Sequence, residues 1–109
     1  MANTFKLKTK ANVGVTTVGI YTAPAATTTV VIGITLSNTS RSGVNVGVGI
    51  TRAGTTEDVK LLKNAPIPQG SSLEFMGGNK VVLETTDTLT VDSDTNNSVD
   101  ASLTIMEIT

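Results

Sequence analysis

The chain of 109 residues contains no cysteine and no histidine. These absences exclude disulfide bonds, thiolate nucleophiles, imidazole bases and the usual ligands of a zinc site, and Ser-His-Asp catalysis with them. Aromatic residues make up only 3% of the chain, and tryptophan is absent. Carboxylates remain, but nothing in the spacing of the nine acidic residues pairs two of them for glycoside hydrolysis. We therefore expect no enzyme and no cofactor.

An excess of charge of one sign is also missing. Eight basic and nine acidic residues give a net charge of −1, and 39% of the residues are hydrophobic. This hydrophobic content is too high, and the net charge too small, for a disordered chain. The chain also lacks the positive field of a nucleic-acid-binding protein, so we expect no nucleic-acid partner. Its length indicates a single domain over residues 1–109.

Long hydrophobic runs are absent as well. The most apolar stretch, residues 30–36, is interrupted by Gly33 and Thr35 and falls far short of the roughly 20 residues that cross a bilayer. The first fifteen residues contain lysines but no apolar run of the kind a secretory signal needs. We expect synthesis in the cytoplasm and no membrane partner.

Threonine and valine, which favour strands, dominate the chain. Residues 28–37 alternate with a period of two, which predicts that Val30, Ile32, Ile34 and Leu36 share one inward face. Residues 44–51 repeat the alternation, with valine and isoleucine on one face and Gly47 and Gly49 on the other, where another backbone could approach closely. Turn-forming residues fill positions 38–43, so we expect these two strands to form a hairpin.

Seven further segments have the composition of strands: 4–11 (with Phe5 and Leu7 facing inward), 15–21, 58–62, 72–75, 80–84, 88–91 and 99–108. Turn-forming residues separate them at 23–24, 53–55, 65–70, 77–79 and 95–97. The spacing predicts an all-β chain, a single antiparallel β-sandwich or jelly roll of about eight or nine short strands. Whether the strand order is that of a jelly roll or of an immunoglobulin-like sandwich stays open.

The last predicted strand has apolar residues on both faces. Val99, Ala101, Leu103 and Ile105 share one face, whereas Met106 and Ile108 lie on the other. Either a bulge shifts the phase of the strand, or a partner covers its second face. The second alternative leads us to expect a homo-oligomer, a dimer or trimer, with Met106 and Ile108 among its contacts.

Lys6, Lys8 and Lys10 alternate onto one face of the first predicted strand, over about 13 Å. Such a stripe can dock on an acidic protein surface. It can equally be a solvated face that protects an edge strand from aggregation. No aromatic residues alternate with the lysines to stack on bases, so the stripe does not favour nucleic acid.

Residues 92–100 place oxygen-bearing side chains at positions 1, 3, 5 and 9 of a calcium loop. The match fails at position 6, where Asn97 replaces glycine, and at position 12, where Leu103 replaces the bidentate glutamate. We therefore interpret the segment as a hairpin turn whose Asx side chains bond their own backbone, with a cation site as the alternative.

Two parts of the sequence form a distinctive pattern: Ala65-Pro66-Ile67-Pro68-Gln69-Gly70 with the segments that follow it, 71–75, 78–84 and 87–91, and residues 21–33. This pattern resembles that of small β-sandwich virion proteins of tailed bacteriophages. The resemblance covers most of the chain. It implies a virion component made in the host cytoplasm. Among such components we favour a capsid decoration (cement) protein that binds the major capsid protein outside the head and clamps neighbouring capsomers.

Two other functions stay open. One is a neck, tail or fibre-attachment protein of the virion, which would be present in fewer copies than a decoration protein. The other is an adhesin-like or carbohydrate-binding module, against which the shortage of aromatic side chains argues.

Overall fold

The computed structural model describes residues 3–52, 57–75 and 80–109, which form nine strands and no helix. None of these residues therefore belongs to a helix long and apolar enough to cross a membrane. The strands are β1 (Asn3–Val13), β2 (Val18–Thr22), β3 (Thr28–Asn38), β4 (Val44–Arg52), β5 (Glu57–Ile67), β6 (Ser72–Phe75), β7 (Val81–Leu83), β8 (Thr88–Ser93) and β9 (Val99–Ile108).

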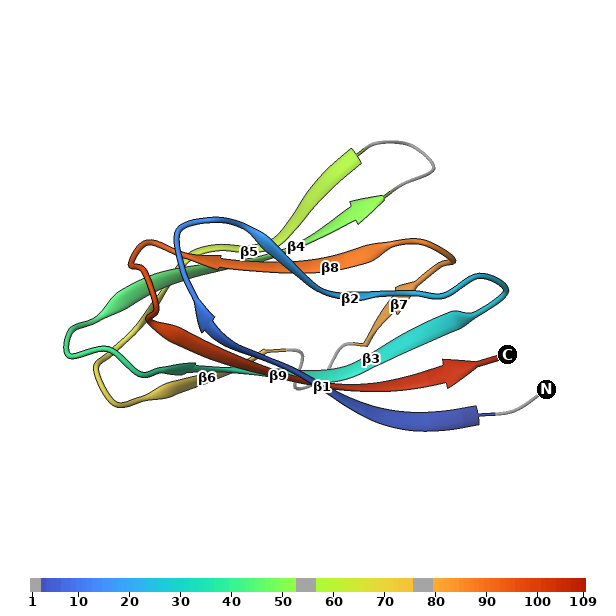
Figure 1. The fold of residues 1–109 in the computed structure, drawn as a ribbon, viewed down its shortest axis with the longest axis horizontal. Helices are drawn as coiled ribbons and strands as arrows, with labels where there is room; N and C mark the ends of the chain where they lie inside the picture. Colours follow the sequence, from blue (N-terminus) through green and yellow to red (C-terminus); the bar gives the residue numbers. More distant parts are fainter. Residues whose placement is uncertain (1–2, 53–56, 76–79) are drawn as a thin grey trace.

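The strands form two antiparallel sheets that pack face to face (Figure 1). Sheet A has the order β1-β9-β3-β6, with β7 also pairing with β3, and sheet B has the order β2-β8-β4-β5. The pairs are nested, because β1 lies beside β9, β2 beside β8, β3 beside β6 and β7, and β4 beside β5. Nested pairing of this kind is a long hairpin rolled into a sandwich, which is the jelly roll. The predicted all-β sandwich is confirmed, and the strand order selects the jelly roll over the immunoglobulin-like alternative.

The hairpin expected between residues 28–37 and 44–51 is wrong. β3 lies in sheet A and β4 in sheet B, so the connection crosses from one sheet to the other. The side-chain amide of Asn38 holds this crossing by donating to the carbonyl oxygens of Ser42 (2.8 Å) and Ile67 (2.9 Å). Alternation in a sequence reveals which side of a strand is buried, but not which strand it pairs with.

The turns lie close to their expected places where the structure describes them. The turn expected at residues 65–70 begins only after Ile67, because β5 extends through Pro66 to that residue. The turns expected at 53–55 and 77–79 lie outside the described residues.

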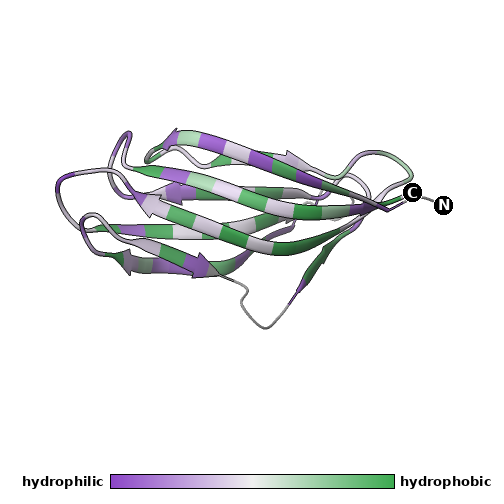
Figure 2. Cartoon of the chain, turned by 90° about the horizontal axis from the view of Figure 1, so that it is seen from below, coloured by the Kyte–Doolittle hydropathy of each residue, from purple (hydrophilic) through white to green (hydrophobic). Residues whose placement is uncertain are grey.

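The core lies between the two sheets and is built from alternate residues of their strands. The inward positions of β4 and β9 are those the alternation predicts, and Figure 2 shows the bands of alternating hydropathy along the strands. The largest almost fully buried side chains among the described residues are Val13, Val31, Ile34, Leu36, Val46, Val48, Ile67, Leu83, Leu89, Val91, Leu103 and Ile105. Apart from Tyr21, the core therefore consists of aliphatic side chains, which both sheets contribute.

The predicted face of β3 is correct for only half of the strand. Ile34 and Leu36 are buried, but Val30 and Ile32 are partly exposed and Val31 is buried in their place. The pairing with β9 shifts between Val31 and Gly33, which leaves Ile32 as the extra residue of a β-bulge. One extra residue inverts the alternation, so the first half of β3 buries the residues expected to face outward.

The predicted face of β1 is inverted. Phe5 and Leu7, expected to face inward, are 69% and 67% exposed. Phe5 lies opposite Met106, whereas Lys6 lies opposite the buried Ile105, and opposed side chains of an antiparallel pair share a face. The lysines therefore occupy the inner face of sheet A. They are tolerated there because β1 is an edge strand, from which long side chains can extend into solvent.

Candidate interaction surfaces

The outer face of sheet A carries an apolar row that crosses four strands. Phe5 on β1 pairs with Met106 on β9, Met106 pairs with Val30 on β3, and Val30 pairs with Val82 on β7. These four residues are called the apolar row below. Phe5 is 69% and Val82 54% exposed. Two more apolar side chains, Leu7 and Ile108, flank the row on the same face.

Charge is scarce on this outer face. Within the strands of sheet A that the structure describes, the outward positions hold two acidic residues, Glu74 and Asp100, and no basic residue. Toward the end of the face that is distant from the apolar row, the outward residues are mainly serine and threonine. Single exposed apolar side chains are ordinary on a protein surface, but a row of them without charge has the composition of an interface core.

Met106 and Ile108 lie on this face, partly exposed. β9 keeps its alternation through Glu107, and the bulge lies in the neighbouring strand β3 instead. The first explanation of the second apolar face, a bulge that shifts the phase of the last strand, is therefore wrong. Coverage of that face by a partner stays a prediction.

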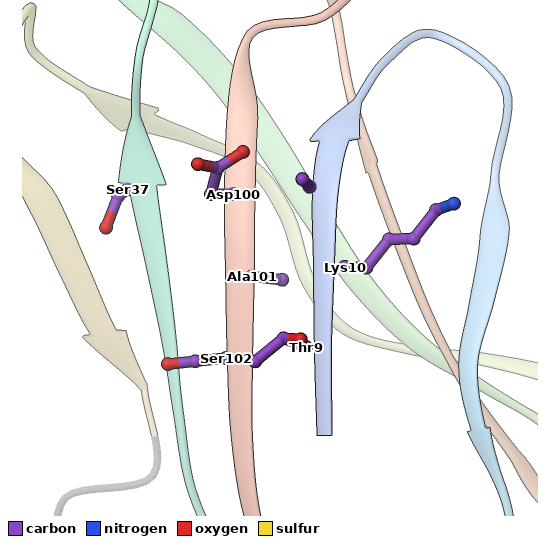
Figure 3. Close-up of a pocket in the computed structure, with 7 residues that line it drawn as sticks. Thr9, Lys10, Ser37, Asp100, Ala101 and Ser102 are labelled. Atoms are coloured by element: carbon purple, nitrogen blue, oxygen red, sulfur yellow. The ribbon is translucent and has the colours of Figure 1, made fainter. Parts of the chain in front are cut away.

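A shallow hollow of about 260 Å³ lies at the opposite end of the same face (Figure 3). Its lining combines hydroxyl groups with one carboxylate, one lysine and two alanines: Thr9, Lys10, Ala11, Ser37, Asp100, Ala101 and Ser102. Asp100 accepts a hydrogen bond from the backbone amide of Asn12 (3.0 Å), which ties the end of β1 to β9. The Lys10 side chain points away from Asp100. The hollow thus continues the polar end of the face and brings together no acid-base pair.

The three lysines share one face of β1, as their alternation predicts, and differ in their surroundings. Lys6 Nζ lies 2.9 Å from Glu107 Oε1, and the Glu107 side chain is only 9% exposed. Neither Lys8 nor Lys10 takes part in an ion pair within the described part of the chain. Any docking role of the stripe would therefore fall mainly to Lys8 and Lys10, because Lys6 is already neutralised.

A buried polar network surrounds Glu107. The Tyr21 hydroxyl donates to Glu107 Oε2 (2.5 Å) and lies 2.8 Å from Thr29 Oγ1. Burial and the bond to Glu107 raise the pKa of Tyr21 to about 12. The hydrogen bond from Tyr21, together with Lys6, lowers the pKa of Glu107. This network is not predicted by the sequence analysis. Glu107 occupies the next inward position after Ile105, and this alternation is the signal that could have indicated its burial.

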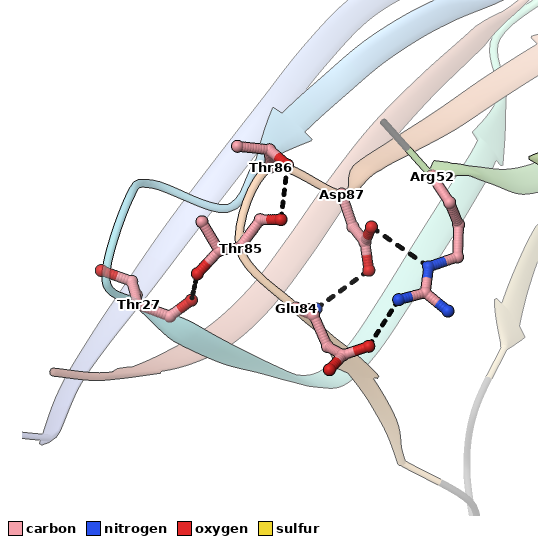
Figure 4. Close-up of polar contacts among 6 residues, drawn as sticks. All are labelled: Thr27, Arg52, Glu84, Thr85, Thr86 and Asp87. Carbon is pink, nitrogen blue, oxygen red and sulfur yellow. Dashed lines mark hydrogen bonds and ion pairs between the residues drawn. The ribbon is translucent and has the colours of Figure 1, made fainter. Parts of the chain in front are cut away.

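A second polar cluster ties the two sheets together (Figure 4). Arg52, at the end of β4 in sheet B, donates through Nε to Asp87 Oδ1 (3.2 Å) and contacts Glu84, which follows β7 in sheet A. Asp87 is 6% exposed at its side chain and also accepts the amide of Glu84 (3.0 Å). The hydrogen bonds from Asp87 and Glu84 raise the pKa of Arg52. Both carboxylates are occupied in holding this turn.

The carboxylates of residues 92–100 point to different partners. Asp92 accepts from the Thr17 hydroxyl (2.8 Å), and Asp94 accepts from the amide of Asn45 (3.1 Å). No group of three or more acidic side chains suited to a metal ion occurs among the described residues.

The segment is also not the hairpin turn we expect, because β8 lies in sheet B and β9 in sheet A. It crosses between the sheets, with the Ser93 and Ser98 hydroxyls 2.7 Å apart and both bonded to the carbonyl of Thr95.

Comparison with known proteins gives one informative result. No family model and no curated protein matches the chain. A chain in the crystal structure of the T13 IBDV viral particle has a similar fold, with a TM-score of 0.59 and 12% sequence identity. The similarity covers 96% of this chain and 30% of the viral chain, so the present chain spans less than a third of that protein. At this identity the similarity establishes the shared fold alone.

Proposed function

We propose that this protein is a structural component of a virion. The observation that carries the proposal is the nested strand order of a jelly roll, a fold common in viral capsids, which matches a chain of the T13 IBDV particle over 96% of the present sequence. The resemblance of residues 65–91 to small virion proteins of tailed bacteriophages supports the same function. Lectins and cupins also have jelly-roll folds, so the fold alone does not select a virion role, and the sequence resemblance is the reason for choosing it.

Within the virion, we place the protein on the capsid exterior as a decoration (cement) protein that binds the major capsid protein. Lys8 and Lys10 at the rim of the sandwich supply a positive edge for an acidic capsid surface. A catalytic role has little support, since Asp87 and Glu84 are held by Arg52 and Glu107 by Lys6. The carbohydrate-binding alternative has less support than the virion role, because the chain has only three aromatic residues and one of them, Tyr21, is buried, which leaves few platforms for a sugar ring although Phe5 is exposed.

Copy number in the particle tests the proposal. Purified virions are separated on a denaturing gel, and the band of this protein is compared by densitometry with that of the major capsid protein. A near-stoichiometric ratio is expected for a decoration protein. A few to a few dozen copies per particle would contradict decoration and support a neck, tail or fibre-attachment protein. Absence from the particle would contradict a virion role altogether.

A binding experiment tests the capsid-facing edge. Undecorated shells are mixed with the protein or with the double variant Lys8→Glu, Lys10→Glu, and sedimented at several salt concentrations. We expect weaker binding of the double variant and a loss of salt dependence, because exposed charge pairs are screened by salt. Lys63→Glu, an exposed change on β5, is the matched control. Equal binding of all three proteins at every salt concentration would refute the role of the lysines.

A further inference from the structure

We propose that the outer face of sheet A is covered by the same face of a second copy of this chain. The two copies are related by a two-fold axis that runs parallel to the strands, between β9 and β3. This inference goes beyond the virion role and does not depend on it. It rests on three observations: the contrast between the two outer faces of the sandwich, the self-complementary arrangement of one of them, and its area.

The two outer faces differ sharply in composition. The outward positions of the central strands of sheet B are small or polar, namely Asn45, Gly47, Gly49 and Thr51 on β4 and Thr88, Thr90 and Asp92 on β8. The corresponding face of sheet A carries the apolar row. On the outward positions of these central strands, apolar side chains are therefore confined to sheet A. Burying such side chains against another apolar surface is favourable by about 25 cal/mol per Å² of apolar area removed from water.

The side chains of sheet A are arranged so that the face complements itself about the proposed axis. Rotation about a line between β9 and β3 places β3 of the second copy over β9, and its β7 over β1. Because Met106 and Val30 are register partners, Met106 then lies over the second copy's Val30. Phe5 lies over the second copy's Val82 for the same reason. The apolar row thus packs on an apolar row.

The polar end of the face is also matched by this axis. Asp100 pairs with Ser37 within the sheet, so rotation places each Asp100 over the second copy's Ser37. Glu74 is level with Thr9, through Thr35 and Ser102, and is placed over the second copy's Thr9. Each of these two carboxylates therefore faces a hydroxyl group and neither faces the other, which avoids the cost of opposed like charges.

The area of the face selects this axis over one perpendicular to the strands. Four strand positions about 4.8 Å apart and the ten residues of β9 at about 3.3 Å each give a flat area of roughly 600 Å². The relief of the side chains raises the accessible area above this value, toward the roughly 800 Å² per partner of a standard interface. A perpendicular axis through the apolar row would overlap only the short end of the face beyond Phe5, which is too little.

The first test measures self-association by sedimentation equilibrium. We expect the protein to be a dimer, and Phe5→Lys to raise the dissociation constant at least about 100-fold, because each dimer then buries two unpaired charges. Val15→Lys is the matched control, since Val15 is 56% exposed but lies outside sheet A. Phe5 is exposed in the single chain, so the variant should fold. Circular dichroism checks this, and Val82→Lys provides an independent second variant.

The second test probes the axis with a single cysteine, which is unique because the chain has none. Ser102 of each copy would lie one strand spacing from the axis-related Ser102 across sheets about 10 Å apart, too far for a disulfide but within reach of a short bis-maleimide. We expect Ser102→Cys to give covalent dimers at protein concentrations above the dissociation constant. Ser42→Cys, exposed in the β3–β4 connection, is the matched control and should stay monomeric on the gel.

Each outcome decides the proposal. A dimer that Phe5→Lys dissociates, Val15→Lys leaves intact and Ser102→Cys cross-links supports it. A wild-type protein that stays monomeric at high micromolar concentration overturns it, as does a dimer with the same dissociation constant in Phe5→Lys and Val15→Lys. A dimer that does not cross-link through Ser102→Cys, or a trimer, overturns the two-fold arrangement.

Discussion

Replacing Tyr21 by phenylalanine isolates the contribution of the buried network to stability. The Tyr21 hydroxyl bonds to Glu107 at 2.5 Å and to Thr29 at 2.8 Å, and its removal leaves the buried carboxylate with Lys6 as its charged partner. A hydrogen bond to a charged group contributes about 1.5–3 kcal/mol. We therefore expect Tyr21→Phe to lower the free energy of unfolding by about 2–3 kcal/mol, and the thermal midpoint by roughly 10 °C.

The pH dependence gives this prediction a second signature. Because the pKa of Tyr21 is raised from 10.0 to about 12, its contribution is complete below pH 10 and is lost between pH 10 and 12, where the unfolded chain ionises first. A pKa raised from 10.0 to about 12 corresponds to a loss of about 2.7 kcal/mol of stability across this pH range. Other groups that titrate in this range are common to the wild type and Tyr21→Phe. The difference between their stability curves should therefore shrink across this window.

The acid side has the opposite sign. The lowered pKa of Glu107 means that its contribution is present above the ordinary pKa of a glutamate and is lost as the pH falls through the lowered value. Tyr21→Phe removes the main cause of that lowering. We therefore expect the stability difference between the wild type and Tyr21→Phe to shrink as the pH falls below the ordinary pKa of a glutamate, because the wild type loses more of the Glu107 contribution than the variant does.

Urea unfolding at a series of pH values measures these differences. Tyr21 is the only tyrosine and there is no tryptophan, so the ultraviolet absorbance of tyrosinate follows this single group. Thr22→Val is the control, because it removes an exposed hydroxyl bond to Thr88 beside the network and should cost less than about 1 kcal/mol. The reasoning is refuted if Tyr21→Phe costs no more than Thr22→Val, or if the folded protein titrates near pH 10.

Two further predictions concern close approaches and turns, and urea unfolding tests both. A Cβ at Gly49 would lie 2.9 Å from the Val59 carbonyl oxygen, so Gly49→Ala should lower the free energy of unfolding by about 1–3 kcal/mol. A Cβ at Gly33 meets nothing within 4 Å, so the control Gly33→Ala should change stability by less than about 1 kcal/mol. Equal effects of the two substitutions would contradict the close approach at Gly49. Asp87→Ala should cost about 2–3 kcal/mol, because it leaves the Glu84 amide and the Nε of Arg52 without their acceptor, and a loss below about 0.5 kcal/mol would contradict that role.

The sequence predicts the architecture well where burial alone decides it. The alternation in β4 and β9 correctly identifies their inward residues, since both strands lie inside their sheets and one face of each packs on the core. It does not predict which strands pair. The segments around Asn38 and Ser98 look like hairpin turns because turn-forming residues suit a crossing between sheets as well as a tight turn.

The candidate surface was predictable only in part. Met106 and Ile108 mark the outer face correctly, because they depart from the buried phase of a regular strand. Phe5 belongs beside them but is assigned inward by the usual rule that apolar residues face the core, and this rule fails on an edge strand whose inner positions hold lysines. An exposed apolar residue on one strand is recognised only when its register partner on the next strand is known.

The bulge at Ile32 leads to a prediction that separates backbone register from hydrophobic content. Deleting Ile32 should give a regular strand, in which Val31 and Ile34 still face inward with Gly33 outward between them, at a cost of no more than about 1–2 kcal/mol because Ile32 is only partly buried. Deleting Thr35 should instead turn Ile34 outward and Gly33 inward, and this loss of a buried isoleucine should cost about 3–5 kcal/mol. Urea unfolding of the two variants compares them directly. If the two deletions lower the free energy of unfolding equally, the bulge at Ile32 is not the cause of the inverted alternation in the first half of β3.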